Sequence, residues 1–143
     1  MAATHQDEVL ATTVPDLHYP AITAQADRLP AFRRILSSWA TSLGMVAEKV
    51  HALTSATYEA MANVVAHAYR GRPGVLEMHA VHCAGEVTVT VVDHGHWRPA
   101  VVGDTDPLRS GGRGVTLIRA LAERVVIKSD GTGTTVRMSW SVA

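Results

Sequence analysis

Residues 59–69 read EAMANVVAHAY, a stretch in which a carboxylate and an amide stand four residues apart among small and apolar side chains. On an α-helix, Glu59 and Asn63 would lie on the same face, and His67 would follow one turn later. The residue types favour a helix over residues 46–69, which the helix-breaking RGRPG that follows would end. Two interpretations are open for the polar pair: it lies at the rim of a buried face, or it belongs to a binding site.

The segments on either side of this helix indicate an α+β fold. Apolar residues recur every three or four positions over residues 23–43 and 114–125, which predicts two more helices. Strands are predicted at residues 12–19, 75–82, 86–93, 125–129 and 134–142. This grouping predicts an α+β two-layer sandwich, with a mixed, largely antiparallel sheet covered on one face by helices. In the central helix, the positions expected to face the core are Val50, Leu53, Ala56, Ala60, Val64 and Ala68.

The composition limits the classes of protein that the chain can represent. Its 143 residues fit one domain, which we expect over residues 12–143 after a disordered tail at 1–11. The 13 basic and 13 acidic residues balance, so we expect no direct contact with nucleic acid or a membrane surface. The single cysteine, Cys83, forms no internal disulfide, and neither a signal-peptide profile nor a membrane-crossing apolar run is present. These features predict a cytoplasmic protein.

A carboxylate stands at the end of a predicted strand, in the sequence VTVVDHG. Asp93 can accept hydrogen bonds from a ligand amine there, and Gly95 would let a flat group approach the backbone. The same residues also suit an ordinary turn. A metal site built from His94 and His96, with Asp93 or His82, is a weaker alternative, because no matching third and fourth ligands complete it.

Two glycine-rich segments follow the strand. Residues 111–114 read GGRG directly before a predicted helix, where free backbone N–H groups and the positive end of the helix suit phosphate. A flexible hinge is the competing interpretation, and the pattern is neither a P-loop nor a Rossmann fingerprint. The long loop at 94–112 predicts a lid. At 131–135, GTGTT opens the last strand, where a small hydroxyl can line a pocket floor.

The order of these motifs resembles the ATP-binding domain of the GHKL superfamily, which has the Bergerat-type fold, and within it the bacterial anti-sigma factor serine/threonine kinases. EAMANVVAHAY is similar to the N box of that family and VVDHGHW to its first glycine box. GGRGVTLI is similar to the second glycine box and GTGTTVRM to the last. The resemblance covers about residues 12–140 and is carried by the four motifs jointly.

The resemblance implies ATP and Mg2+ as ligands, with a role for each motif. Asn63 would hold the Mg2+ that bridges the phosphates, and Glu59 would take the proton from the attacking hydroxyl of a protein substrate. Asp93 would receive the adenine amino group, Gly95 would shape the pocket, and Thr134 would reach adenine. The phosphates would be held by the backbone at Gly112 and Gly114, with Arg113 or Arg109 from the lid.

The resemblance also implies an anti-sigma factor that binds a sigma factor and phosphorylates an anti-sigma factor antagonist, and a homodimer with the first strand and first helix as contact surface. The alternative is a nucleotide-dependent module that sequesters a sigma factor or signalling partner with little or no phosphotransfer. His96 favours the alternative, because the family's first glycine box usually has a second glycine there. The family's N box often ends in His-Gly-Tyr, where this chain has Ala68. A sensor histidine kinase is disfavoured, because no residues remain for a phosphoaccepting helical hairpin.

Overall fold

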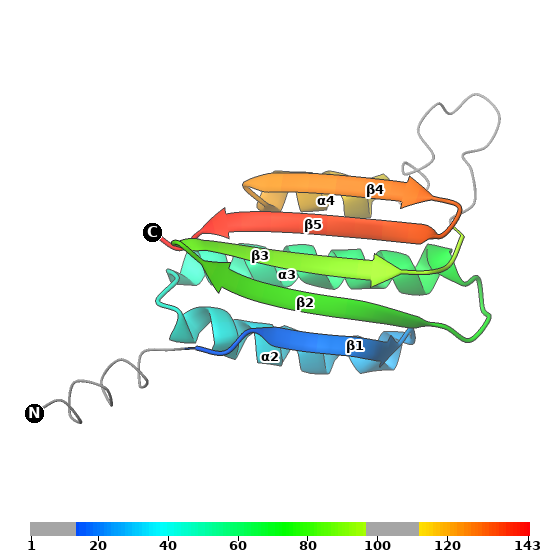
Figure 1. The fold of residues 1–143 in the computed structure, drawn as a ribbon, viewed down its shortest axis with the longest axis horizontal. Helices are drawn as coiled ribbons and strands as arrows, with labels where there is room; N and C mark the ends of the chain where they lie inside the picture. Colours follow the sequence, from blue (N-terminus) through cyan, green and yellow to red (C-terminus); the bar gives the residue numbers. More distant parts are fainter. Residues whose placement is uncertain (1–13, 97–111) are drawn as a thin grey trace, which may run out of the picture.

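Buried and partly exposed residues alternate along the third strand, and this pattern determines which face of the sheet the helices cover. In β3 (Glu86–Asp93), Val87, Val89 and Val91 are buried, and the residues between them are partly exposed. Successive side chains of a strand point to opposite faces, so only one face of this strand is apolar. The helices lie together on one side of the sheet (Figure 1). The three valines therefore share the face that the helices cover.

The computed structural model describes residues 14–96 and 112–143. Its sheet has five strands in the order β1-β2-β3-β5-β4. Besides β3, the strands are β1 (Leu17–Thr23), β2 (Val75–Cys83), β4 (Arg124–Asp130) and β5 (Gly133–Ser141). The helices and helical turns are η1 (Ala26–Arg28), α2 (Leu29–Ser42), α3 (Ala47–Asn63), η2 (Val64–Ala68) and α4 (Gly112–Leu121).

The α+β two-layer sandwich predicted from the sequence is confirmed. Each pairing between the described strands is antiparallel, so the sheet lacks the parallel part that a mixed sheet would contain. The two predicted strands at 75–82 and 86–93 form an antiparallel hairpin, in which β2 and β3 pair from Leu76 with Asp93 to Cys83 with Glu86.

Helix α3 is the central element of the helical layer, in contact with α2, α4 and the strands β3 and β5. A fully buried valine or leucine stabilises a fold by about 1.5–3 kcal/mol relative to an exposed one. The apolar stripe of α3 therefore fixes the helix on the sheet and sets the direction of its polar residues. The positions predicted to face the core are all buried: Val50, Leu53, Ala56, Ala60, Val64 and Ala68.

The predicted single helix over residues 46–69 is wrong at its end. Regular α-helix stops at Asn63, and Val64–Ala68 form a π-helical turn. His67 is therefore not one α-helical turn after Asn63, because a π-turn contains more residues than an α-turn. Propensity does not distinguish the two, since both use the same residue types.

The first strand also differs from its prediction. It runs over Leu17–Thr23 rather than 12–19, and it lies at the edge of the sheet. Pro20 falls inside the strand, between Tyr19 and Ile22, where the pairing with β2 shifts register. A proline cannot donate to the ladder, and the edge position tolerates this loss.

The last helix begins two residues earlier than predicted, at Gly112, and ends at Leu121 rather than 125. Strand β4 then starts at Arg124. The predicted tail at 1–11 and most of the predicted lid lie outside the described residues.

Candidate functional site

Helix α3 carries Glu59 and Asn63 on successive turns, about 6 Å apart along the axis. Asn63 is 7% exposed, and its Nδ2 has no hydrogen-bond partner among the described residues. A buried polar group without a partner costs about 1–3 kcal/mol, and such groups are rare. Glu59 is half-buried. Asn63 is therefore not a rim residue, and its amide nitrogen is still able to donate a hydrogen bond to a ligand.

The π-turn η2 brings Ala68 against the turn that follows β3. The backbone N–H of His96 donates to the Ala68 carbonyl at 2.8 Å. A Cβ added to Gly95 would lie 2.2 Å from the same carbonyl oxygen. Glycine is thus required at position 95 by the chain itself, whereas the sequence suggested close approach of a flat ligand. A role of Gly95 toward a ligand stays a prediction.

His96 does not need to be glycine. In the described residues, the only non-glycine residues with positive φ are Arg70 and Ala84, so His96 has a backbone conformation open to any L-residue. Its side chain is exposed, and its carbonyl accepts a hydrogen bond from Arg70 Nη2 at 3.1 Å. The departure from the usual glycine box is therefore accommodated without backbone strain.

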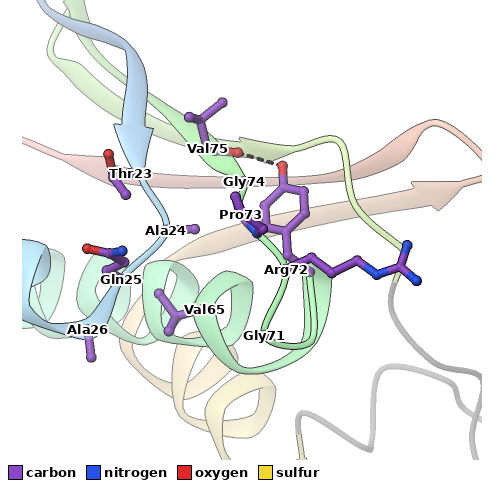
Figure 2. A pocket seen from close by; sticks show the side chains of 11 residues that line it. Thr23, Ala24, Gln25, Ala26, Val65, Gly71, Arg72, Pro73, Gly74 and Val75 are labelled. Carbon is purple, nitrogen blue, oxygen red and sulfur yellow. Dashed lines mark hydrogen bonds between the residues drawn. The ribbon is translucent and has the colours of Figure 1, made fainter.

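Tyr69 connects the end of the helix to two strands. Its hydroxyl donates to the Val75 carbonyl at 2.6 Å, a hydrogen bond that Figure 2 draws as a dashed line ending at Val75. The same oxygen accepts a hydrogen bond from the His94 N–H at 3.0 Å. A Cβ on Gly74 would lie 2.4 Å from the Tyr69 ring, so the loop packs on the ring face. No role for Tyr69 was predicted from the sequence; the signal that could have indicated one is a tyrosine placed directly after a helix.

Asp93 lies in a row of polar residues that crosses three strands. It is 1% exposed, and its Oδ1 accepts a hydrogen bond from the Gly95 N–H at 3.0 Å. Thr134 of β5 pairs with Asp93 of β3 and with Ser129 of β4. The hydroxyls of Thr134 and Ser129 are 2.9 Å apart. Cross-strand register thus adds Ser129, which sequence spacing alone could not connect with Asp93.

The second glycine box forms the first turn of α4. Gly112, Arg113 and Gly114 are its first three residues, and the first backbone N–H groups of a helix have no partner within the helix. Such groups, with the positive end of the helix dipole, favour an anion. The predicted lid residue Arg109 lies outside the described residues.

The structure joins some of the predicted residues directly and leaves others apart. The Gly95 N–H donates a hydrogen bond to the Asp93 carboxylate, and Asp93 pairs with Thr134 in the register of β3 and β5. Ala68 connects this group to the helix that carries Asn63 and Glu59. Gly112 and Gly114 belong to α4, which packs against α3 in the helical layer.

The histidine metal site is not supported. His82 pairs with Val87 at one end of β3, and Asp93 lies at the other end, about 20 Å away along the strand. Across residues 14–96 and 112–143, no group of three or more His, Cys, Asp or Glu side chains is placed to hold a metal ion.

Two pockets flank Tyr69. One, of about 740 Å³, is lined by residues 23–26, 65, 69 and 71–75, and contains none of the predicted site residues (Figure 2). The other, of about 540 Å³, includes Gly95 together with basic side chains. Neither of these two pockets includes Asp93 or Asn63.

Burial lowers the pKa of His67 below its ordinary value of 6.5. The imidazole lies in the π-turn between Asn63 and Ala68. Because desolvation penalises the charged form, the folded chain favours the neutral ring.

A sheet covered on one face by helices, with a buried amide on α3 and a buried carboxylate ending β3, is the architecture of the GHKL class. Residues 22–140 match the family model described as a histidine kinase-like ATPase domain. The chain belongs to this family.

Curated relatives and solved structures agree with that placement. The anti-sigma F factor of Caldanaerobacter subterraneus subsp. tengcongensis is 26% identical over 115 residues, which are 75% of this chain and 80% of the relative. That of Clostridium acetobutylicum is 26% identical over 117 residues, 76% of this chain and 82% of the relative.

Among solved structures, the RsbU and RsbW domains of a Mycobacterium tuberculosis protein share the fold, with a TM-score of 0.70 and 21% identity. The match covers 90% of this chain but 32% of the mycobacterial chain, so this chain spans about a third of that length. The histidine kinase domain of an Erythrobacter litoralis blue-light activated kinase has a TM-score of 0.59 at 19% identity, covering 95% of this chain and 69% of that one. Among the described residues, no helix is long and apolar enough to span a membrane.

Proposed function

We propose that the chain binds an adenine nucleotide between α3, the end of β3 and the start of α4. The observation that carries this proposal is the burial of Asp93 beside Thr134 on the helix-covered face. A carboxylate removed from water requires hydrogen-bond donors, and the adenine amino group is one that it can accept. Thr134 would add a hydroxyl next to that contact.

The residues on α3 fit a magnesium ion. Mg2+ prefers hard oxygen ligands, and the side-chain amide of the buried Asn63 supplies one such oxygen, Oδ1. The bound ion would neutralise charge on the nucleotide phosphates. The first-turn N–H groups at Gly112 and Gly114, with Arg113 or Arg109, would hold the same phosphates.

We further propose that Glu59 serves as a general base. In this step the hydroxyl oxygen of a serine or threonine attacks the γ-phosphorus of ATP, and the bond to the β-phosphate oxygen breaks. ADP leaves, and the hydroxyl proton passes to the Glu59 carboxylate. Its half-buried position, one turn before Asn63, supports this assignment.

The biological role that we propose is a cytoplasmic anti-sigma factor that phosphorylates an anti-sigma factor antagonist. Support comes from the relatives named anti-sigma F factor, which match over 75% of this chain or more.

We also propose a homodimer through β1 and α2, for which the free edge of β1 is available in the described sheet. Sedimentation at several protein concentrations tests the dimer.

Calorimetric titration and phosphotransfer together test these assignments. We expect Asp93→Asn to lose ATP binding, and Glu59→Ala to keep magnesium-ATP binding but lose transfer of radiolabelled phosphate to a matched antagonist. Glu48→Ala, which removes an exposed carboxylate from the same helix, is the control and should change neither.

The possible results separate the parts of the proposal. Absence of ATP binding by the unmodified chain would refute the nucleotide site. Binding without transfer would favour the sequestering module over the kinase. Full transfer by the Glu59 variant would remove the proposed base.

A further inference from the structure

A cationic pocket lies beside the turn that follows β3. Its volume is about 540 Å³, and its lining residues are Ala68, Tyr69, Arg70, Arg72, Pro73, His94, Gly95 and His96. Two arginines and two histidines line it, and none of the lining residues is acidic. Because the whole chain has 13 basic and 13 acidic residues, this is a local concentration of positive charge.

Within residues 14–96 and 112–143, neither arginine has a carboxylate partner. The ion pairs among the described residues involve other cations, such as Arg124 with Glu86 and Lys49 with Glu123. Arg70 donates to the neutral carbonyl of His96, and the side chain of Arg72 has no hydrogen bond in the described structure. In Figure 2, Arg72 points away from Thr23 and Gln25, which line the neighbouring larger pocket. Two guanidinium groups thus line one pocket without neutralisation.

The backbone that carries the arginines has an unusual conformation. Arg70 has a φ of 51° and Gly71 a φ of 81°. The first left-handed residue after a helix is usually glycine, because a Cβ is unfavourable there. Here the glycine is second and an arginine takes the first position. A strained conformation that places a charged side chain in a pocket is typical of binding sites.

We propose that this pocket binds a phosphate group. A guanidinium presents paired N–H donors that match phosphate oxygens, and clustered arginines are the usual means of recognising phosphorylated groups. The hydrogen bond from the Arg70 guanidinium to the His96 carbonyl keeps the Arg70 side chain in place. The backbone N–H of Arg72 donates to the Tyr69 carbonyl at 3.0 Å, which fixes the loop. The site stands apart from the proposed ATP phosphate contacts, because it includes neither Asn63 nor any residue of α4. The inference holds whether or not the chain binds a nucleotide.

Titration with inorganic phosphate, followed by NMR of the backbone amides, tests the site. In the unmodified chain, the amides of Gly71, Arg72 and His96 should shift in a saturable way. Chloride at matched ionic strength should give no saturable shift. Arg72→Gln should weaken phosphate binding about tenfold, since a hydrogen bond to a charged group contributes about that factor. Because the Arg72 side chain makes no internal hydrogen bond, this variant should fold normally.

The matched control removes equal charge elsewhere. Arg70→Gln with Arg72→Gln should abolish the saturable shifts, and Arg34→Gln with Arg137→Gln should leave them unchanged. Arg34 and Arg137 are exposed on α2 and β5. Equal weakening by both pairs would overturn the site, because it would show a general effect of net charge. A saturable response confined to Gly112 and Gly114 would overturn it as well.

Peptides identify the source of the phosphate. Tighter binding of a phosphoserine peptide than of inorganic phosphate, lost in Arg72→Gln, would assign the site to a phosphorylated protein. Inorganic phosphate binding alone would assign it to the free anion. A peptide with aspartate in place of phosphoserine that binds equally well would refute the phosphate preference. Repeating the titration in Asp93→Asn removes any contribution from the proposed adenine contact.

Discussion

The Tyr69 hydroxyl bridges the backbones of two strands, donating to Val75 at the start of β2 and accepting from His94 just after β3. Both strand ends therefore depend on one side chain from the end of the helix that carries Asn63. The turn held in this way contains Gly95, whose N–H bonds the carboxylate of Asp93. The position of the proposed adenine contact is thus tied to the helix through a phenol group.

We expect Tyr69→Phe to lower the free energy of unfolding by about 1–3 kcal/mol, because two backbone groups lose their partner. ATP affinity should fall with it if Asp93 binds adenine. Tyr58→Phe is the control, since the Tyr58 ring packs under Arg33. Urea unfolding and calorimetry measure both effects. Equal stability of the two variants would contradict the bridging role.

Gly95→Ala should destabilise the fold by about 1–3 kcal/mol, because the new methyl group would overlap the Ala68 carbonyl. Gly131→Ala is matched to it: its Cβ would meet no atom within 4 Å, and its φ is not positive. We expect that control to stay within about 0.5 kcal/mol of the unmodified chain. Comparable unfolding midpoints for the two alanine variants would show that Gly95 tolerates a side chain.

Asn63→Ala should leave the free energy of unfolding of the ligand-free chain unchanged or higher, because it removes a buried amide without a partner for Nδ2. It should also abolish the stabilisation by magnesium-ATP, which rises with ligand concentration for any chain that binds when folded. Thr57→Val is the control. Thr57 Oγ1 is also buried without a hydrogen-bond partner among the described residues, and its loss should not affect the stabilisation by magnesium-ATP. Strong destabilisation of the ligand-free Asn63 variant would instead indicate a structural role.

Stability should decrease on acidification below about pH 6.5, through the lowered pKa of His67. Below that pH the unfolded chain binds a proton more readily than the folded chain does, so acid favours unfolding. The contribution is fully present above pH 6.5 and is lost as the pH falls toward the folded pKa. Urea midpoints across this range should vary less in His67→Gln than in the unmodified chain, while His51→Gln, exposed on α3, should keep the slope. Parallel curves for all three chains would contradict this effect.

Periodic elements were predictable, and contacts between distant segments were not. The buried stripe of α3 and the valines of β3 follow from periods of 3.6 and 2, which are local properties. The π-turn ends at Ala68, whose carbonyl meets Gly95 and His96, a contact that no local pattern encodes.

The same distinction applies to the site. Asp93 and Asn63 could be named from motifs, but Ser129 joins Asp93 only through the register of β4, β5 and β3. Tyr69 was visible as the end of a motif, yet its two partners are known only from the fold. The order of the strands, with β5 between β3 and β4, likewise required the structure.

The π-turn also restricts which changes in chain length this region can tolerate. Each residue of an α-helix turns the chain by about 100°. A π-turn holds one residue more than an α-turn, so regular α-helix through Val64–Ala68 with the same number of residues would rotate everything after it by about that amount. The phenol would then face away from both strands, so the bridge that Tyr69 makes between them depends on the extra residue that the π-turn accommodates.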